Sequence, residues 1–208
     1  RIESFGHIAE DLVSGFKFMF GAEKIMFITR RVFFMMIAIM VFYIALTGGG
    51  LERMLLSAGH GIKPIGALGL MQAALGLGLV AGVLMIGRVS RAISDEKLIR
   101  AIFPVFGSLI IALYFVNNYF FLLAIALAGG MGGMMVLSIA ETAVQKETPA
   151  GMRGRIFAAY YVFRNTGPLI ASGLAGFLIR FIKEEEVMLA AGVALLLYGL
   201  VNMIWKKS

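Results

Sequence analysis

The sequence contains no cysteine and few charged residues. Among its 208 residues there are no cysteines, four prolines and one tryptophan, and only 15% of the residues are charged. The lack of cysteine excludes disulfides and thiolate metal sites. A soluble domain has about a quarter of its residues charged. This chain therefore has too few ionic groups for a surface that faces water on every side.

Apolar residues take the place of the missing charges. They make up 60% of the chain, and the mean hydropathy is +0.91. A soluble fold could not bury this much apolar surface, so the composition predicts a protein that folds in a lipid bilayer. The net charge of +7 does not indicate a nucleic-acid partner, because the lysines and arginines gather at the ends of apolar runs and form no basic face.

Six apolar segments are long enough to cross a membrane. A hydrocarbon layer of about 30 Å requires roughly 20 helical residues, and none of the segments alternates with the period of a strand. We predict an all-α membrane protein with six transmembrane helices in one bundle over residues 32–208. Because the connections are short, consecutive helices should be antiparallel neighbours. The predicted spans are 32–51, 64–89, 98–116, 119–144, 156–182 and 187–205.

Residues 1–31 precede the first span and contain an amphipathic stretch. Ile8, Leu12 and Phe16 repeat at helical spacing, with Glu10 and Lys17 on the other side. This pattern predicts either a helix that lies in the membrane interface or a cytoplasmic helix that packs on loops. The sequence starts with arginine instead of methionine, so we expect a fragment of a longer protein.

Lysines and arginines are distributed unequally between the two sides of the predicted bundle. Fourteen lie before the first span, in the second and fourth loops and at the C-terminus, whereas the opposite side holds four: Arg53, Lys63, Arg180 and Lys183. Positive residues favour the cytoplasmic side of a membrane protein. The distribution predicts that both termini of this chain are cytoplasmic.

Two segments carry sequence motifs. The first, 69–88, is rich in glycine and ends with Gly87-Arg88. The second contains Pro149 followed by Arg153-Gly154-Arg155, and then Gly167-Pro168. Both segments resemble the drug- and siderophore-exporter branch of the major facilitator superfamily, and the Pro-x-x-x-Arg-Gly-Arg turn is the more specific match.

The resemblance covers nearly the whole chain and implies the C-terminal half of a twelve-helix transporter in the bacterial inner membrane. The N-terminal half is the alternative. However, Ser90, Arg91 and Ala92 stand where the family often has an acidic residue, and such a degenerate loop is typical of the C-terminal half. The implied partners are the lipid bilayer, a small-molecule substrate and the missing N-terminal six-helix half.

The arginines of the two motifs are expected in cytoplasmic loops with a gating role. Arg88 ends the first motif, and Arg153 and Arg155 belong to the second. Guanidinium groups bind carboxylates and the C-terminal ends of helices. We predict that Arg153 and Arg155 hold the cytoplasmic ends of the two halves together.

Small residues within the spans predict close helix packing, because apolar helices in lipid associate mainly where small side chains let their backbones approach. The sequence leaves two roles open for them. They either hold the helices statically or let them slide and bend as a transporter changes state. The candidates are Gly78, Gly82, Gly130, Gly133, Gly167, Pro168, Ser172 and Gly176.

Polar residues inside spans are costly and are therefore candidates for substrate binding or ion coupling. They are Gln72, Glu141, Tyr161, Arg164 and Asn165. Arg164 keeps its charge and needs an anion, a carbonyl group or water. It either extends to the cytoplasmic surface or pairs with Glu141, about 8 Å away along the helix axis. Burial favours a protonated Glu141, which suits proton exchange, whereas a partner arginine favours its carboxylate.

These observations predict a non-enzymatic secondary transporter that exports lipophilic or amphipathic molecules, as a proton-coupled antiporter working by alternating access. A lysolipid or siderophore carrier is an alternative within this class, and a non-transporting membrane scaffold or subunit is one outside it. The short loops disfavour half of an ATP-driven exporter. The sequence shows no phosphate-binding loop, metal-ligand cluster or nucleophile–base set, so no cofactor and no metal are expected.

Overall fold

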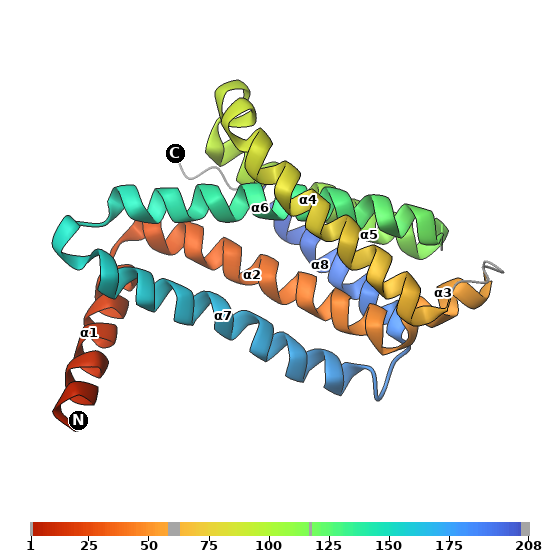
Figure 1. Cartoon of the computed structure of the whole chain (residues 1–208), viewed down its shortest axis with the longest axis horizontal. Coiled ribbons are helices and arrows are strands. Elements are labelled where there is room, and N and C mark those ends of the chain that lie inside the picture. The colour runs from red at the N-terminus through yellow and green to blue at the C-terminus, as the bar shows by residue number, and fades with distance from the viewer. Residues whose placement is uncertain (1, 58–62, 117, 205–208) are drawn as a thin grey trace.

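The computed structural model describes residues 2–57, 63–116 and 118–204 (Figure 1). Helices make up nearly all of this part and it contains no strand, so the prediction of an all-α protein is confirmed. The α-helices are α1 (Ile2–Gly21), α2 (Glu23–Ala45), α3 (Leu51–Ser57), α4 (Pro64–Ala92), α5 (Asp95–Val116), α6 (Tyr119–Glu147), α7 (Arg153–Leu178) and α8 (Glu184–Ile204). A π-helical turn (Leu46–Gly50) joins α2 to α3, and a 3-10 turn (Ala150–Met152) precedes α7.

Five stretches of the described chain are long and apolar enough to cross a membrane: Glu23–Leu56, Pro64–Ala92, Glu96–Val116, Tyr119–Glu147 and Glu184–Met203. The remaining predicted span, 156–182, corresponds to α7. This helix has 26 residues but is more polar than the other five, because Arg164, Asn165 and Thr166 lie in its middle. The structure therefore shows five candidate spans, and a membrane crossing by α7 stays a prediction.

Several helix ends follow from local sequence. Pro64 occupies the first turn of α4, where its missing N–H is not needed. Asn118 caps α6, since its side-chain oxygen accepts hydrogen bonds from the backbone N–H groups of Phe120 (2.8 Å) and Phe121 (3.2 Å). Helix α2 begins at Glu23, nine residues before the predicted start of the first span, and Ala22 alone separates it from α1.

The main helix pairs are α4 with α6, α5 with α8, α2 with both α7 and α8, and α1 with α7. The prediction that consecutive helices are neighbours is therefore wrong for most of the bundle, because these pairs join helices that are not consecutive in the chain. The α4–α6 contact is especially close. A methyl group at Gly78 would collide with the carbonyl oxygen of Leu127, and one at Gly130 would collide with that of Leu75. Only glycine permits this approach of two backbones. These two helices therefore form a tightly packed unit.

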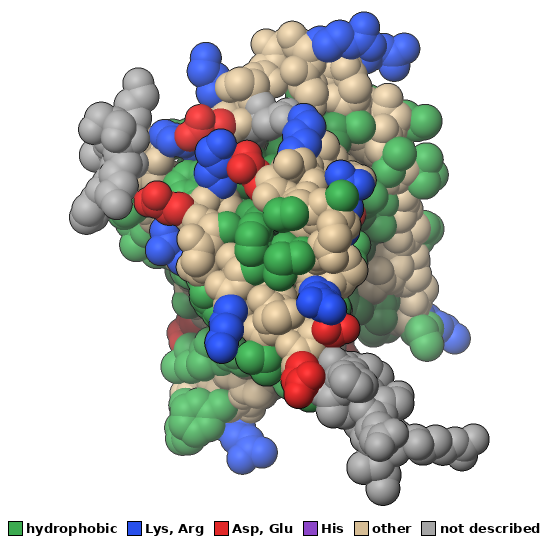
Figure 2. Space-filling view, turned by 90° about the vertical axis from the view of Figure 1, so that its left-hand side faces the viewer, with side chains coloured by type: hydrophobic (Ala, Val, Ile, Leu, Met, Phe, Trp, Pro, Cys, Tyr) green, Lys and Arg blue, Asp and Glu red, His purple; other side chains and the backbone are tan. Residues whose placement is uncertain are grey.

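One end of the bundle carries much of the positive charge. It contains residues 22–31, 88–100, 146–155 and 202–204, and we call it the basic end. Lys24 at the start of α2 contacts Glu147 at the end of α6 (Nζ–Oε1 3.1 Å). Figure 2 views this side of the molecule and shows Lys and Arg side chains spread over it among apolar groups.

Helix α1 leaves the bundle at the basic end and crosses the start of α7 (Figure 1). Gly15 faces α7, where a side chain would collide with the backbone carbonyl of Arg155. Asp11 adds an ion pair with Arg155 (Oδ1–Nε 2.8 Å), and Met19 is fully buried. Helix α1 is therefore fixed to α7 by a close backbone contact and one ion pair.

The opposite end of the bundle contains a glycine turn. Gly49 has φ of 156°, a value that favours glycine, and it interrupts the helix between α2 and α3. Arg53 of α3 pairs with Glu184 at the start of α8 (3.0 Å). The chain is thus kinked here and held to α8 by an ion pair.

Candidate functional site

Glu141 and Arg164 form an ion pair between α6 and α7. The Nη1 atom of Arg164 donates a hydrogen bond to Oε1 of Glu141 over 2.8 Å, so of the two alternatives left open for Arg164 the structure shows the pairing. Glu141 lies six residues before the end of α6, and Arg164 lies eleven residues after the start of α7. These positions are about 9 Å and 16 Å from the basic end. The arginine side chain therefore leans toward that end to reach its partner.

Two tyrosines lie beside the guanidinium group of Arg164. Its central carbon is 4.8 Å from the ring centre of Tyr161 and 5.8 Å from that of Tyr160. An aromatic face attracts a cation, so both rings stabilise the arginine in its paired position. Tyr160 is fully buried, whereas Tyr161 is 37% exposed. Sequence reasoning left Tyr160 out of the site, although its spacing of four residues from Arg164 places both on one helix face.

The ion pair is only partly covered by this chain. The side chain of Arg164 is 20% exposed and that of Glu141 is 37% exposed. Asn165 is exposed next to them. The hydroxyl of Thr166, in contrast, donates to the carbonyl of Val162 in its own helix (2.6 Å). The polar surface of α7 at this level thus consists of the ion pair, Tyr161 and Asn165.

Gln72 does not lie near the ion pair. Its amide donates to the hydroxyl of Tyr43 on α2 (2.8 Å). The neighbouring contact from the Tyr119 hydroxyl to the Ala67 carbonyl sets the register of α4 against α6, which leaves Gln72 about 25 Å from Glu141 along the axis. The structure therefore separates Gln72 from the other predicted polar candidates.

The motif arginines lie at the basic end. Arg88 and Arg153 are exposed. Arg155 is bound to Asp11 of the same chain, a partner that sequence reasoning did not assign, although Asp11 lies on the polar face of the amphipathic stretch. Contact of Arg153 and Arg155 with another half of the protein stays a prediction.

The predicted packing residues fall into two groups. Gly78, Gly82 and Gly130 lie where α4 meets α6, and Gly167 faces Phe33 of α2. Of the others, Gly133 and Gly176 show no such contact, because no described atom lies within 4 Å of a Cβ built at either. Ser172 is exposed and donates to the carbonyl of Pro168. Gly133 instead lines the smaller cavity described below, whereas Ser172 and Gly176 are small residues four apart on α7.

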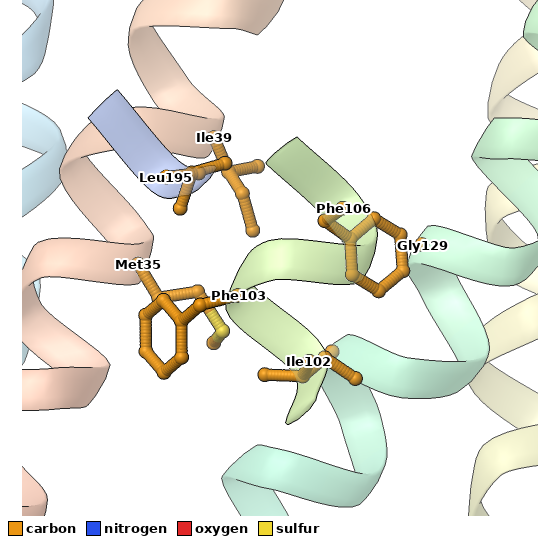
Figure 3. Close-up of a pocket in the computed structure, with 8 residues that line it drawn as sticks. Met35, Ile39, Ile102, Phe103, Phe106, Gly129 and Leu195 are labelled. Atoms are coloured by element: carbon orange, nitrogen blue, oxygen red, sulfur yellow. The ribbon is translucent and has the colours of Figure 1, made fainter. Parts of the chain in front are cut away.

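Two apolar cavities lie inside the bundle. The smaller, of about 20 Å³, is lined by Met35, Phe103, Phe106 and Leu195 with four neighbours (Figure 3). The larger, of about 120 Å³, lies among α2, α4, α5 and α6. Water needs polar partners to occupy such spaces, so both suit apolar groups. The described residues contain no cluster of three metal-binding side chains.

The long apolar helices and the internal ion pair define a multi-pass helical membrane protein. Residues 7–207 match the sequence model of the transmembrane secretion effector family, within the major facilitator superfamily. The chain belongs to this family. It is thus a member of a group of membrane transporters. No curated protein and no solved structure matches the chain.

Proposed function

We propose that the chain is the C-terminal half of a secondary transporter that exports lipophilic or amphipathic small molecules by proton-coupled alternating access. Family membership supports transport. The observation that carries the proposal is the partly exposed ion pair between Glu141 and Arg164 inside two apolar helices. Charges at such positions are rare in structural helices and typical of ion and substrate pathways.

In this proposal all six predicted spans cross the membrane, including α7. Its 26 residues extend about 39 Å, and it packs along α2, which is a candidate span. The basic end faces the cytoplasm, in accord with the charge distribution, and α1 lies in the interface there. The exposed faces of α4 and α7 contact the N-terminal half.

The ion pair works as a switch. While α6 and α7 are close, Arg164 stabilises the carboxylate of Glu141. When the helices separate, the carboxylate loses this partner and takes up a proton, so proton binding and helix separation favour one another. The exposed face of Tyr161 next to the pair suits a lipophilic cation. Export follows if substrate and proton compete for the same open state.

A vesicle assay tests this function. The intact protein is reconstituted in sealed vesicles, and the movement of a lipophilic fluorescent cation is followed after a pH gradient is imposed. We expect gradient-dependent flux that a protonophore abolishes and that Glu141→Gln reduces at least tenfold. Glu147→Gln is the matched control, because Glu147 forms an exposed ion pair at the end of the same helix. The contrary result is that the protein binds this cation, a siderophore or a lysolipid whether or not a gradient is present, and transports none of them. That result would favour the scaffold alternative.

A further inference from the structure

A large cavity opens at the basic end, away from the Glu141–Arg164 pair. It has a volume of about 790 Å³ and lies between the α1–α2 junction and the last turns of α8. Its lining includes Phe20, Phe27, Arg30, Arg31, Tyr198 and Asn202. The cavity thus combines aromatic walls with two adjacent arginines.

Arg31 is a buried cation without an acidic partner among the described residues. Only 3% of the surface of Arg31 is exposed. Nη2 and Nε both donate to Oδ1 of Asn202, over 2.8 and 3.3 Å, and the guanidinium carbon lies 3.4 Å from the ring centre of Phe27. No described carboxylate lies within ion-pair distance of it. A buried guanidinium normally pairs with an anion, so this one is available to an external anion.

The other charged groups around the cavity balance one another and leave the charge of Arg31 uncompensated. Arg30 and Glu23 are both exposed and both line the cavity. On α5, Glu96 and Arg100 lie close enough to act on Arg31 electrostatically, but they pair with each other. Three arginines thus face two carboxylates, which leaves an excess of one positive charge. The Tyr198 hydroxyl and Arg100 Nε are also buried without a hydrogen-bond partner in the described structure.

The depth of the cavity matches that of lipid headgroups. Arg31 immediately precedes the predicted first span, and Asn202 lies in the last turn of α8. A row of exposed apolar residues runs from the cavity along α8 at four-residue spacing. It consists of Val201 (52% exposed), Leu197 (55%) and Val193 (37%). Residues four apart share one helix face. This row leads from the arginines toward the middle of the membrane.

We propose that this cavity binds the phosphate of an anionic phospholipid between Arg30 and Arg31, with an acyl chain along Val193, Leu197 and Val201. Arginine binds phosphate oxygens through two parallel N–H groups, and Asn202 holds the Arg31 side chain in position for this contact. The site is separate from the proposed transport path. It links α1, α2 and α8, so a bound lipid stabilises the basic end.

Lipid titration tests the proposal. Dioleoylphosphatidylglycerol is added to the delipidated intact protein in detergent, and retained lipid and the thermal midpoint are measured. We expect saturable binding that raises the midpoint. Removing one arginine near the membrane surface weakens attraction by about 1 kcal/mol, or roughly fivefold, so Arg31→Gln should weaken binding at least this much. Arg30→Gln should act in the same direction, and it keeps the fold because Arg30 is exposed. Arg91→Gln, an exposed arginine at the same end, should bind as wild type does.

Three results would overturn the proposal. One is an unchanged phosphatidylglycerol response in both Arg30→Gln and Arg31→Gln. Another is an equal response to dioleoylphosphatidylcholine, which would show that the anionic headgroup is not recognised. The third is an equal midpoint increase with inorganic phosphate alone, which would identify the occupant as a free anion instead of a lipid.

Discussion

Arg164 of α7 and Glu141 of α6 are joined by a hydrogen-bonded ion pair of 2.8 Å, although α6 and α7 are not among the main packed helix pairs. Helix α6 packs mainly on α4, and α7 packs on α2 and α1. The ion pair therefore adds a polar contact between two helices whose main packing partners differ. The two helices also share a buried apolar cluster at the basic end, where Val144 of α6 meets Ile156 and Tyr160 of α7.

The first prediction is that Glu141 and Arg164 are energetically coupled. Glu141→Gln, Arg164→Gln and the double variant are compared by thermal unfolding of the intact protein in detergent. The double variant should lose less stability than the sum of the single losses, because each single change strands one charge. We expect a coupling of about 0.5–2 kcal/mol. Additive losses would mean that the two charges act independently.

The second prediction concerns the α4–α6 contact. Gly78→Ala forces a methyl group onto the carbonyl of Leu127, so the helices must separate, at a cost of about 1–3 kcal/mol. Gly76→Ala is the control on the same helix, because no described atom lies within 4 Å of its added methyl group. Thermal unfolding should show a lower midpoint for the first variant alone. Equal midpoints would contradict the close contact.

The third prediction separates the two contacts that hold α1. The Asp11–Arg155 pair is about half exposed on both sides, so Asp11→Asn should change stability by less than about 1 kcal/mol. Gly15→Leu should displace α1, because its side chain meets the backbone of Arg155. Limited proteolysis between α1 and α2 reports the displacement. Faster cleavage in Asp11→Asn than in Gly15→Leu would show that the ion pair dominates.

The fourth prediction concerns orientation. The chain has no cysteine, so single cysteines can be labelled at chosen positions. Ser94→Cys and Glu186→Cys lie at opposite ends of the bundle and both positions are exposed. In intact cells an impermeant thiol reagent should label position 186 but not position 94. The reverse pattern would place the basic end outside the cell.

Hydropathy and charge predict much of this fold because the bilayer imposes a minimum helix length and penalises internal charge. The Glu141–Arg164 pair was predictable for the same reason, since two costly charges on consecutive helices favour pairing. Gly78 was recognisable because only small residues allow two helices in lipid to approach closely.

The remaining features depend on tertiary contacts that sequence spacing does not encode. In the sequence, Arg31 looks like the other arginines at the ends of predicted spans. Its buried position involves Asn202, which is 171 residues away in the chain. The sequence does not show which carboxylate pairs with Arg155. The partner is Asp11 because α1 lies across the start of α7. The π-helical turn before α3 also escapes a hydropathy profile, because a kink leaves the apolar run unbroken.

Reciprocal accessibility along α7 tests alternating access most directly. Ala158 and Ser172 are both exposed, and their spacing of fourteen residues puts them on one helix face about 21 Å apart. In intact protein without other cysteines, Ala158→Cys and Ser172→Cys are labelled from each side of sealed vesicles, with and without a pH gradient. We predict that reactivity falls at one position while it rises at the other, and that Glu141→Gln abolishes this exchange. Unchanged reactivity at both positions, or a change in the same direction at both, would contradict the account.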